Sequence, residues 1–109
     1  MNRLALAARG AAATACIAVA GLAVADPAVI TIEQMQFAPP SVTIHVGDTV
    51  MWVNRDLVTH NVSEKAKGFD SGSIAPAGSW RYTATRPGHY YYTCRFHPAM
   101  RGIVIVEPK

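Results

Sequence analysis

Three side chains with metal-binding atoms stand close together near the C-terminus of this sequence. Cys94, His97 and Met100 supply a thiolate, an imidazole and a thioether within one short segment. Soft sulfur ligands with imidazole suit copper, and two histidines, one cysteine and a distant methionine sulfur form the ligand set of electron-transfer copper sites. The segment therefore predicts a copper site, although it contains only one of the two histidines that such a site needs.

The second histidine has to come from another part of the chain, and the candidates are His45, His60 and His89. His45 has the outward parity of an alternating strand, and His89 opens a strand directly after a Pro-Gly turn, so both are expected at the solvated surface. His60 follows a tryptophan-containing strand and a polar turn, which could bring it to the end of the Cys94 strand. We therefore predict that His60 is the second histidine.

The first 25 residues have the pattern of a secretory signal peptide. A basic start with Arg3 and Arg9 precedes an alanine-rich apolar run, and Ala23-Val24-Ala25 offers the small-x-small motif that a signal peptidase cleaves. The run is shorter than the roughly 20 residues that span a bilayer, so an uncleaved anchor is the weaker alternative. We expect a mature domain of residues 26–109, located in the periplasm and without a membrane span after cleavage.

Cysteine usage and charge narrow the function further. If cleavage follows Ala25, Cys94 is the only cysteine of an exported domain and cannot form an internal disulfide, so metal ligation is the first candidate role for its thiol. The formal net charge of +3 falls to about +1 without Arg3 and Arg9, because residues 26–109 contain eight Lys and Arg and seven Asp and Glu. No basic patch remains that would favour nucleic acid as a partner.

The mature region reads as strands and turns throughout. Strand-like segments occur at residues 29–32, 42–46, 49–54, 79–85, 89–93 and 103–106, and no segment has a sustained helical period. Six or more short strands in one small domain predict an all-β sandwich of two antiparallel sheets. Residues 63–78 are expected to form a surface connection with a short strand near 71–74.

Taken in order, these features resemble the cupredoxins, the type 1 blue copper proteins. The resemblance covers nearly the whole mature region and rests on these residues: Val46-Gly47-Asp48-Thr49-Val50, Trp52, Asn54, Asp56, His60-Asn61-Val62, Phe69-Asp70-Ser71-Gly72, Pro87-Gly88, Tyr90, Tyr92, Cys94, His97-Pro98, Met100 and Gly102. The Cys-x-x-His-x-x-Met spacing is similar to the short ligand loop of the amicyanins. The resemblance implies a Greek-key β-sandwich that holds one copper ion, Cu(I) or Cu(II), through His60, Cys94, His97 and the weak axial ligand Met100.

The same resemblance implies a function. By this resemblance we expect a small exported monomer that is not an enzyme and that shuttles single electrons between transient redox partners. The expected donor is a dehydrogenase or another oxidoreductase, and the expected acceptor is a c-type cytochrome or an oxidase. The C-terminal histidine ligand of cupredoxins reaches the surface, so His97 is the expected electron port, with Phe96, Pro98 and Ala99 as an apolar patch around it. The family pattern also places Asn61 where it hydrogen-bonds to the Cys94 segment.

Three other classes of function use parts of the same pattern. A periplasmic copper carrier or buffer would use the same ligand types but would have to release its metal. A copper enzyme would need further metal centres, and only His45 and His89 are left in the mature region to build them. A β-sandwich without metal would leave the complete ligand set unexplained. Electron transfer is therefore the function that the sequence favours.

Overall fold

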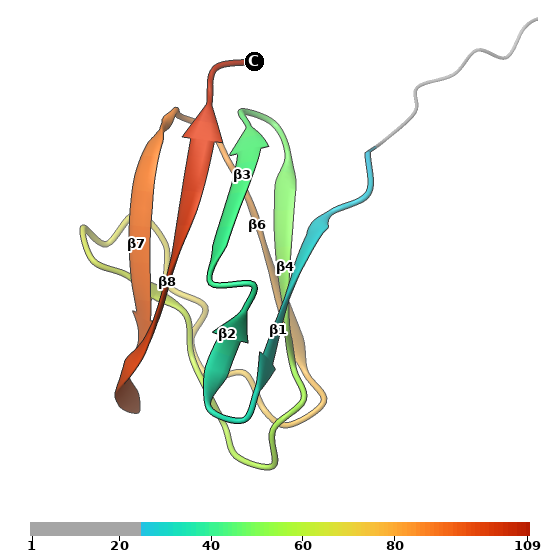
Figure 1. Cartoon of the computed structure of the whole chain (residues 1–109), viewed down its shortest axis with the longest axis vertical. Coiled ribbons are helices and arrows are strands. Elements are labelled where there is room, and N and C mark those ends of the chain that lie inside the picture. The colour runs from blue at the N-terminus through green and yellow to red at the C-terminus, as the bar shows by residue number, and fades with distance from the viewer. Residues whose placement is uncertain (1–24) are drawn as a thin grey trace, which may run out of the picture.

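Two four-stranded β-sheets pack face to face in the computed structural model, which describes residues 25–109 (Figure 1). The first sheet has the order β2-β1-β4-β6, with β1 (Ala28–Glu33), β2 (Gln36–Ala38), β4 (Thr49–Asn54) and β6 (Ser79–Thr83). The second has the order β3-β8-β7-β5, with β3 (Ser41–His45), β5 (Ser63–Glu64), β7 (Gly88–Cys94) and β8 (His97–Glu107). The expected all-β sandwich is confirmed. The signal peptide expected over residues 1–25 lies, apart from its last residue, outside the described residues.

Both sheets are mixed, which corrects the expectation of two antiparallel sheets. β1 runs parallel to β4 and β3 runs parallel to β8, whereas the other strand pairs are antiparallel. After β2 the chain crosses to the second sheet, forms β3 there and returns to the first sheet as β4. Because of this crossover, β1 and β4 are neighbours in the sheet without being joined by a hairpin. A crossover connection of this kind allows two strands to pair in parallel.

Alternation along the strands fills the space between the sheets with apolar side chains. In β4, for example, Val50, Trp52 and Asn54 are buried and the residues between them are partly exposed. Trp52 contacts the ring of Tyr92 edge-on, with the ring centroids 5.4 Å apart. Burial of each large apolar side chain contributes about 1.5–3 kcal/mol. The buried apolar residues that hold the two sheets together are Ile30, Ile32, Phe37, Ile44, Val50, Trp52, Val62, Phe69, Ile74, Ala84, Tyr92, Cys94, Met100, Val104 and Val106.

The connection over residues 63–78 differs in part from its prediction. Its first two residues form β5 at the edge of the second sheet, beside β7. The short strand expected near residues 71–74 does not form. Instead Ile74 makes a single bridge with His60 and Asp70 makes one with Ser63. These bridges bring the chain beyond β4 back toward the core, which is how His60 becomes buried.

Three connections meet at the end of the sandwich opposite the C-terminus (Figure 1). They are the β1–β2 turn, the segment that follows β4 and the β7–β8 turn. The β1–β2 turn is a two-residue turn in which Gln34 and Met35 have φ values of 55° and 60°, a backbone twist that suits a tight hairpin. At the other end Gly47, with φ 98°, connects β3 to β4, a conformation that glycine adopts without a steric penalty. The candidate ligands belong to the first of these two ends.

Candidate metal centre

His60 is placed by the segment that follows β4. The buried side chain of Asn54 donates hydrogen bonds to the carbonyl oxygens of Val58 and Ile74, each at 2.9 Å. The backbone of His60 exchanges hydrogen bonds with Ile74, at 3.1 and 2.7 Å. The side chain of His60 is fully buried as a result. The hydrogen bonds of the inward-facing Asn54 therefore hold the segment after β4 against the sandwich. This places the side chain of His60 in the interior.

The other three candidate ligands come from the β7–β8 hairpin. Cys94 ends β7 and His97 begins β8, so that the two residues are register partners across the turn. Cys94 and Met100 are buried, and His97 is half-buried. A register irregularity between Thr93 and Cys94 marks the point where the regular ladder ends, a feature common beside functional sites.

The structure brings the His60 segment and the hairpin together. Nδ1 of His60 lies 3.6 Å from Sγ of Cys94 in the buried interior, and the rings of His60 and His97 have centroids 5.3 Å apart. Met100 is close to both His60 and Cys94. Among residues 25–109, no group of three or more His, Cys, Asp or Glu side chains is close enough together to form a metal site. His60 and Cys94 are thus in contact, while His97 stands beside them, nearer the surface.

The two rejected histidines lie away from this group. His45 is 58% exposed and lies near Asp48 and Glu107, with its ring nitrogens 3.9 and 3.7 Å from their carboxylates. His89 is exposed on β7. The prediction that both are surface residues is confirmed.

Asp56 contacts His60, and the sequence argument did not assign it a role. Its Oδ2 lies 2.7 Å from Nε2 of His60. Burial raises the pKa of Asp56, but hydrogen bonds from the Met35 backbone, the His60 ring and the Gln34 backbone outweigh that effect and hold the pKa below 3.8. The sequence offers two signals for Asp56: its place in the cupredoxin pattern, and a carboxylate four residues before a candidate ligand, which also fits an ordinary turn.

A second polar cluster ties the Cys94 hairpin to the His60 segment. The backbone N–H of Arg95 donates to Oδ1 of Asn61 at 2.7 Å, which confirms the hydrogen bond expected for Asn61. The amide of Asn61 donates in turn to Asp70 at 3.0 Å, and the guanidinium of Arg95 pairs with the same carboxylate. The Gly72 N–H and the positive charge of Arg95 lower the pKa of Asp70, although burial opposes them. The residues that follow two candidate ligands are therefore joined to each other.

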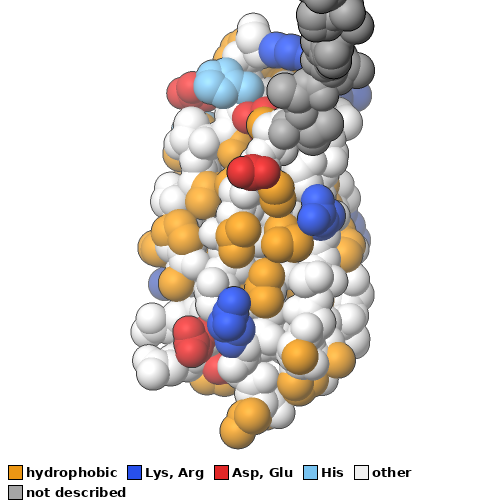
Figure 2. All heavy atoms as spheres, turned by 90° about the vertical axis from the view of Figure 1, so that its right-hand side faces the viewer, with side chains coloured by type: hydrophobic (Ala, Val, Ile, Leu, Met, Phe, Trp, Pro, Cys, Tyr) orange, Lys and Arg blue, Asp and Glu red, His pale blue; other side chains and the backbone are white. Residues whose placement is uncertain are grey.

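Exposed apolar side chains surround this end of the molecule. We call Met35, Leu57, Val58 and Phe96 the apolar rim; Leu57 is 94% exposed and the other three between 41% and 49%. Each belongs to one of the three connections that meet there, and Figure 2 shows apolar side chains at the same end of one face. The expected patch of Phe96, Pro98 and Ala99 is exposed as well. The half-buried His97 therefore lies in an apolar environment that is open to solvent.

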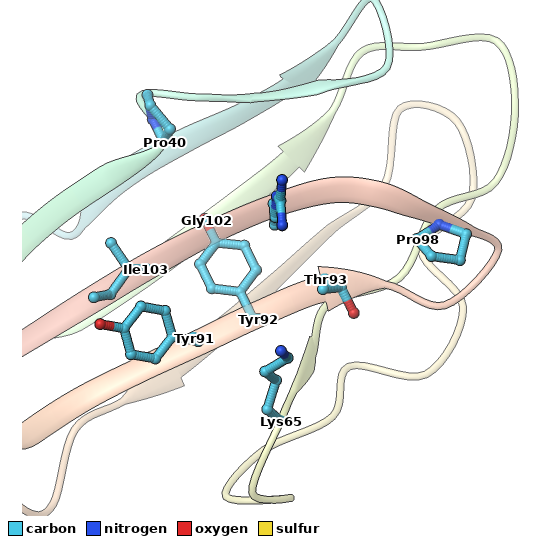
Figure 3. Close-up of a pocket in the computed structure, with 9 residues that line it drawn as sticks. Pro40, Lys65, Tyr91, Tyr92, Thr93, Pro98, Gly102 and Ile103 are labelled. Carbon is cyan, nitrogen blue, oxygen red and sulfur yellow. The ribbon is translucent and has the colours of Figure 1, made fainter.

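A separate hollow of about 490 Å³ is formed by β7, β8 and the residues around them (Figure 3). Its lining includes Lys65, Tyr91, Thr93 and Arg101, and it contains none of the four candidate ligands. Tyr92 and Gly102 also contribute to it, from neighbouring positions on the two strands. The hollow is therefore distinct from the candidate metal centre.

The donor set fits copper. A thiol and an imidazole nitrogen face each other inside the protein, a thioether lies close by, and a second imidazole stands at the surface. Sulfur and imidazole donors favour copper or zinc over magnesium and calcium, and the additional thioether favours copper over zinc. These residues can therefore hold a copper ion at this end of the sandwich.

Comparison with known proteins gives consistent matches. The sequence profile described as copper binding proteins, plastocyanin/azurin family, matches residues 25–107. Amicyanin of Paracoccus versutus is 42% identical over 89 residues, which cover 76% of this chain and 67% of that protein. Amicyanin of Paracoccus denitrificans is 37% identical over 95 residues, covering 77% and 69%. The crystal structure of Paracoccus versutus amicyanin superposes with a TM-score of 0.69 at 38% identity, covering 78% of this chain and 85% of that chain.

Proposed function

Because the chain belongs to the plastocyanin/azurin family of copper-binding proteins, we propose that it is a small exported type 1 copper protein that passes single electrons between redox partners. The observation that carries the proposal is the buried contact between Nδ1 of His60 and Sγ of Cys94 at 3.6 Å. An imidazole and a thiolate are ligands of this kind of copper site, so His60 and Cys94 would both hold the ion.

The proposed ligands have different roles. His60, Cys94 and His97 would be the principal ligands of the ion, and Met100 would be a fourth, weaker ligand. A bound copper ion would supply one-electron chemistry by alternating between Cu(I) and Cu(II). The protein would contribute a ligand frame that changes little between the two states, because Asn61 and Asp56 accept hydrogen bonds from the segments that carry Cys94 and His60 and so hold them in place.

His97 is the proposed point at which electrons enter and leave. It is half-buried, and the apolar rim with Pro98 and Ala99 surrounds the turn from which it projects. An apolar surface of limited size favours short-lived docking, and a net charge near +1 after removal of residues 1–25 gives only weak long-range steering. Partners of this kind would be a dehydrogenase or oxidoreductase as donor and a c-type cytochrome or an oxidase as acceptor.

The cellular setting belongs to the same proposal. Cleavage of residues 1–25 would release residues 26–109 into the periplasm as a monomer. The charge balance of the mature region gives no support for nucleic acid as a partner. The proposal makes the protein an electron carrier rather than a copper enzyme, because an enzyme would need further metal centres and only His45 and His89 are left in the mature region to build them.

Addition of copper(II) to the purified protein, followed by visible spectroscopy, tests the proposal. We expect an intense thiolate-to-copper charge-transfer band that is lost in Cys94→Ser and altered or lost in His60→Gln. His45→Gln is the matched control and should keep the band, since His45 is exposed and distant from Cys94. Reversible one-electron voltammetry of the coloured protein is expected as well. A colourless wild-type protein would refute the proposal.

The same sample separates an electron carrier from a copper carrier or buffer. A site whose two halves are joined by the Asn61, Asp70 and Arg95 hydrogen bonds should release its metal slowly. Loss of the charge-transfer band to a mild copper chelator within seconds would favour the carrier function. Retention over hours together with fast electron exchange would favour electron transfer.

A further inference from the structure

Asp56 joins two segments of the chain through one carboxylate. Its Oδ2 lies 2.7 Å from Nε2 of the His60 ring. The same carboxylate accepts two backbone N–H groups, that of Gln34 on Oδ1 at 2.6 Å and that of Met35 on Oδ2 at 3.0 Å. Only 13% of the Asp56 side chain is exposed, and His60 is fully buried. The carboxylate is therefore held between the β1–β2 turn and the imidazole.

This contact determines which nitrogen of His60 carries the proton. An ionised carboxylate can only accept hydrogen bonds, so Nε2 has to be the donor. Nδ1 then presents its lone pair to Sγ of Cys94, 3.6 Å away. In the other tautomer an unprotonated Nε2 would face an anionic oxygen at 2.7 Å, and a buried repulsion of that kind is costly. The nitrogen that faces Cys94 is the one left free to bind a metal.

The β1–β2 turn prevents the carboxylate from rotating away. Gln34 and Met35 both have positive φ values, a backbone region that non-glycine residues enter only at a steric cost. In this conformation both of their N–H groups point to Asp56 and provide two hydrogen bonds to an ionised acceptor. Any rotation of the carboxylate away from His60 would also break these two bonds.

We propose that Asp56 is a positioning residue: it fixes the His60 ring in the Nε2–H tautomer, with Nδ1 turned to Cys94, before a metal arrives. The proposal rests on the proposed function only in taking His60 as a ligand. Outer-sphere partners of metal-binding histidines typically contribute a factor of about 10–100 to metal affinity. A negative charge beside a ligand also favours Cu(II) over Cu(I), so loss of the charge should raise the reduction potential.

The first test uses the metal-free protein and the variants Asp56→Asn and Asp48→Asn. Asp56→Asn keeps the shape of the side chain but can offer an N–H to Nε2, which favours the other tautomer. Asp48→Asn is the matched control, because Asp48 also accepts a backbone N–H and lies near a histidine ring. It belongs to the connection between β3 and β4, which lies at the opposite end of the sandwich (Figure 1). Long-range ¹H–¹⁵N spectra report which ring nitrogen of His60 is protonated. We expect the ratio of Nε2–H to Nδ1–H to fall about fivefold or more in Asp56→Asn and to stay unchanged in the control.

The second test measures copper(II) affinity of the same proteins by competition with a chelator. Asp56→Asn should bind about 10–100-fold more weakly than the wild type, and Asp48→Asn should bind equally well. A tautomer ratio or a copper affinity within twofold of the wild type in folded Asp56→Asn would overturn the proposal. If the wild type binds no copper, the proposed function fails, and the tautomer measurement still decides whether Asp56 positions His60.

Discussion

The hydroxyl end of Tyr92 lies against Gly102, its register partner across the β7–β8 pair (Figure 3). A Cβ atom on Gly102 would lie 2.5 Å from Cζ of Tyr92 and 3.0 Å from the carbonyl oxygen of Pro40. Glycine is required here because no space exists for a side chain. The contact sets the distance between β7 and β8 two residues before Cys94 and two residues after Met100, and so it supports the spacing of both candidate ligands.

Gly102→Ala should lower the free energy of unfolding by about 1–3 kcal/mol, as overpacking of a filled interior usually does. Urea unfolding followed by circular dichroism measures the loss. The same substitution in a Tyr92→Leu background should cost clearly less, because the obstructing ring is then absent. Equal losses in the two backgrounds would show that Tyr92 is not the obstacle.

Tyr92 should make the protein sensitive to alkaline pH. Burial raises the pKa of Tyr92 to about 12, and the nearby side chain of Trp52 offsets only part of this rise. The unfolded chain releases the same proton near pH 10, so this contribution to stability is complete below about pH 10 and is lost as the pH rises toward 12. Tyr92→Phe should therefore reduce the loss of stability between pH 10 and 12, as measured by urea unfolding.

At neutral pH the same variant should be as stable as the wild type or up to about 1 kcal/mol more stable. The hydroxyl of Tyr92 is buried without a hydrogen-bond partner in the described part of the chain, and removal of an unpaired buried polar group costs little. Tyr91→Phe is the control, since Tyr91 is exposed on the same strand. An alkaline profile unchanged by Tyr92→Phe would contradict the prediction.

Asn61→Ala should loosen the connection between the Cys94 hairpin and the His60 segment. It removes the acceptor of the Arg95 N–H and the donor to Asp70, which we expect to cost about 1–3 kcal/mol of unfolding free energy. Arg95→Ala removes only an exposed ion pair and should cost less than about 1 kcal/mol. Thermal or urea unfolding of the metal-free proteins compares them, and a larger loss in Arg95→Ala would reverse our ranking.

Asp70 should contribute to stability in a way that depends on acid pH. The Gly72 N–H lowers its pKa below 3.8, and the Arg95 charge adds to this effect against the opposing influence of burial. The contribution is therefore complete above the unfolded pKa and is lost as the pH falls through the lower folded value. Asp70→Asn should be less stable than the wild type at pH 6 and should lose less stability on acidification. Unfolding curves at pH 6, 4 and 3 measure this, and parallel profiles would argue against it.

The strand pattern predicted much of the fold, because alternation identifies which residues face inward. It placed His45 on the surface and Cys94 at the end of a strand, as observed. Alternation does not identify the neighbour of a strand, so the parallel pairs β1–β4 and β3–β8 were not foreseen. The prediction of a strand near residues 71–74 was wrong, because Ile74 alone among these residues forms a β-bridge, and its partner is His60.

Candidate ligands can be selected from a sequence where residue types carry the chemistry. His60, Cys94, His97 and Met100 could be selected from the sequence because sulfur and imidazole groups are rare and distinctive. The role of Asp56 could not, since an aspartate in a turn is common and its contact with the Gln34–Met35 turn joins residues more than 20 positions apart. Distant backbone groups that converge on one carboxylate leave no local pattern in a sequence.

His60 comes from the chain beyond the first sheet, whereas Cys94, His97 and Met100 belong to the second. The contact between Nδ1 of His60 and Sγ of Cys94 therefore exists only after the two layers have come together. An ion that needs both atoms can therefore be bound only by the folded domain. Maturation would then proceed in a fixed order, in which folding is completed first and metal is loaded last.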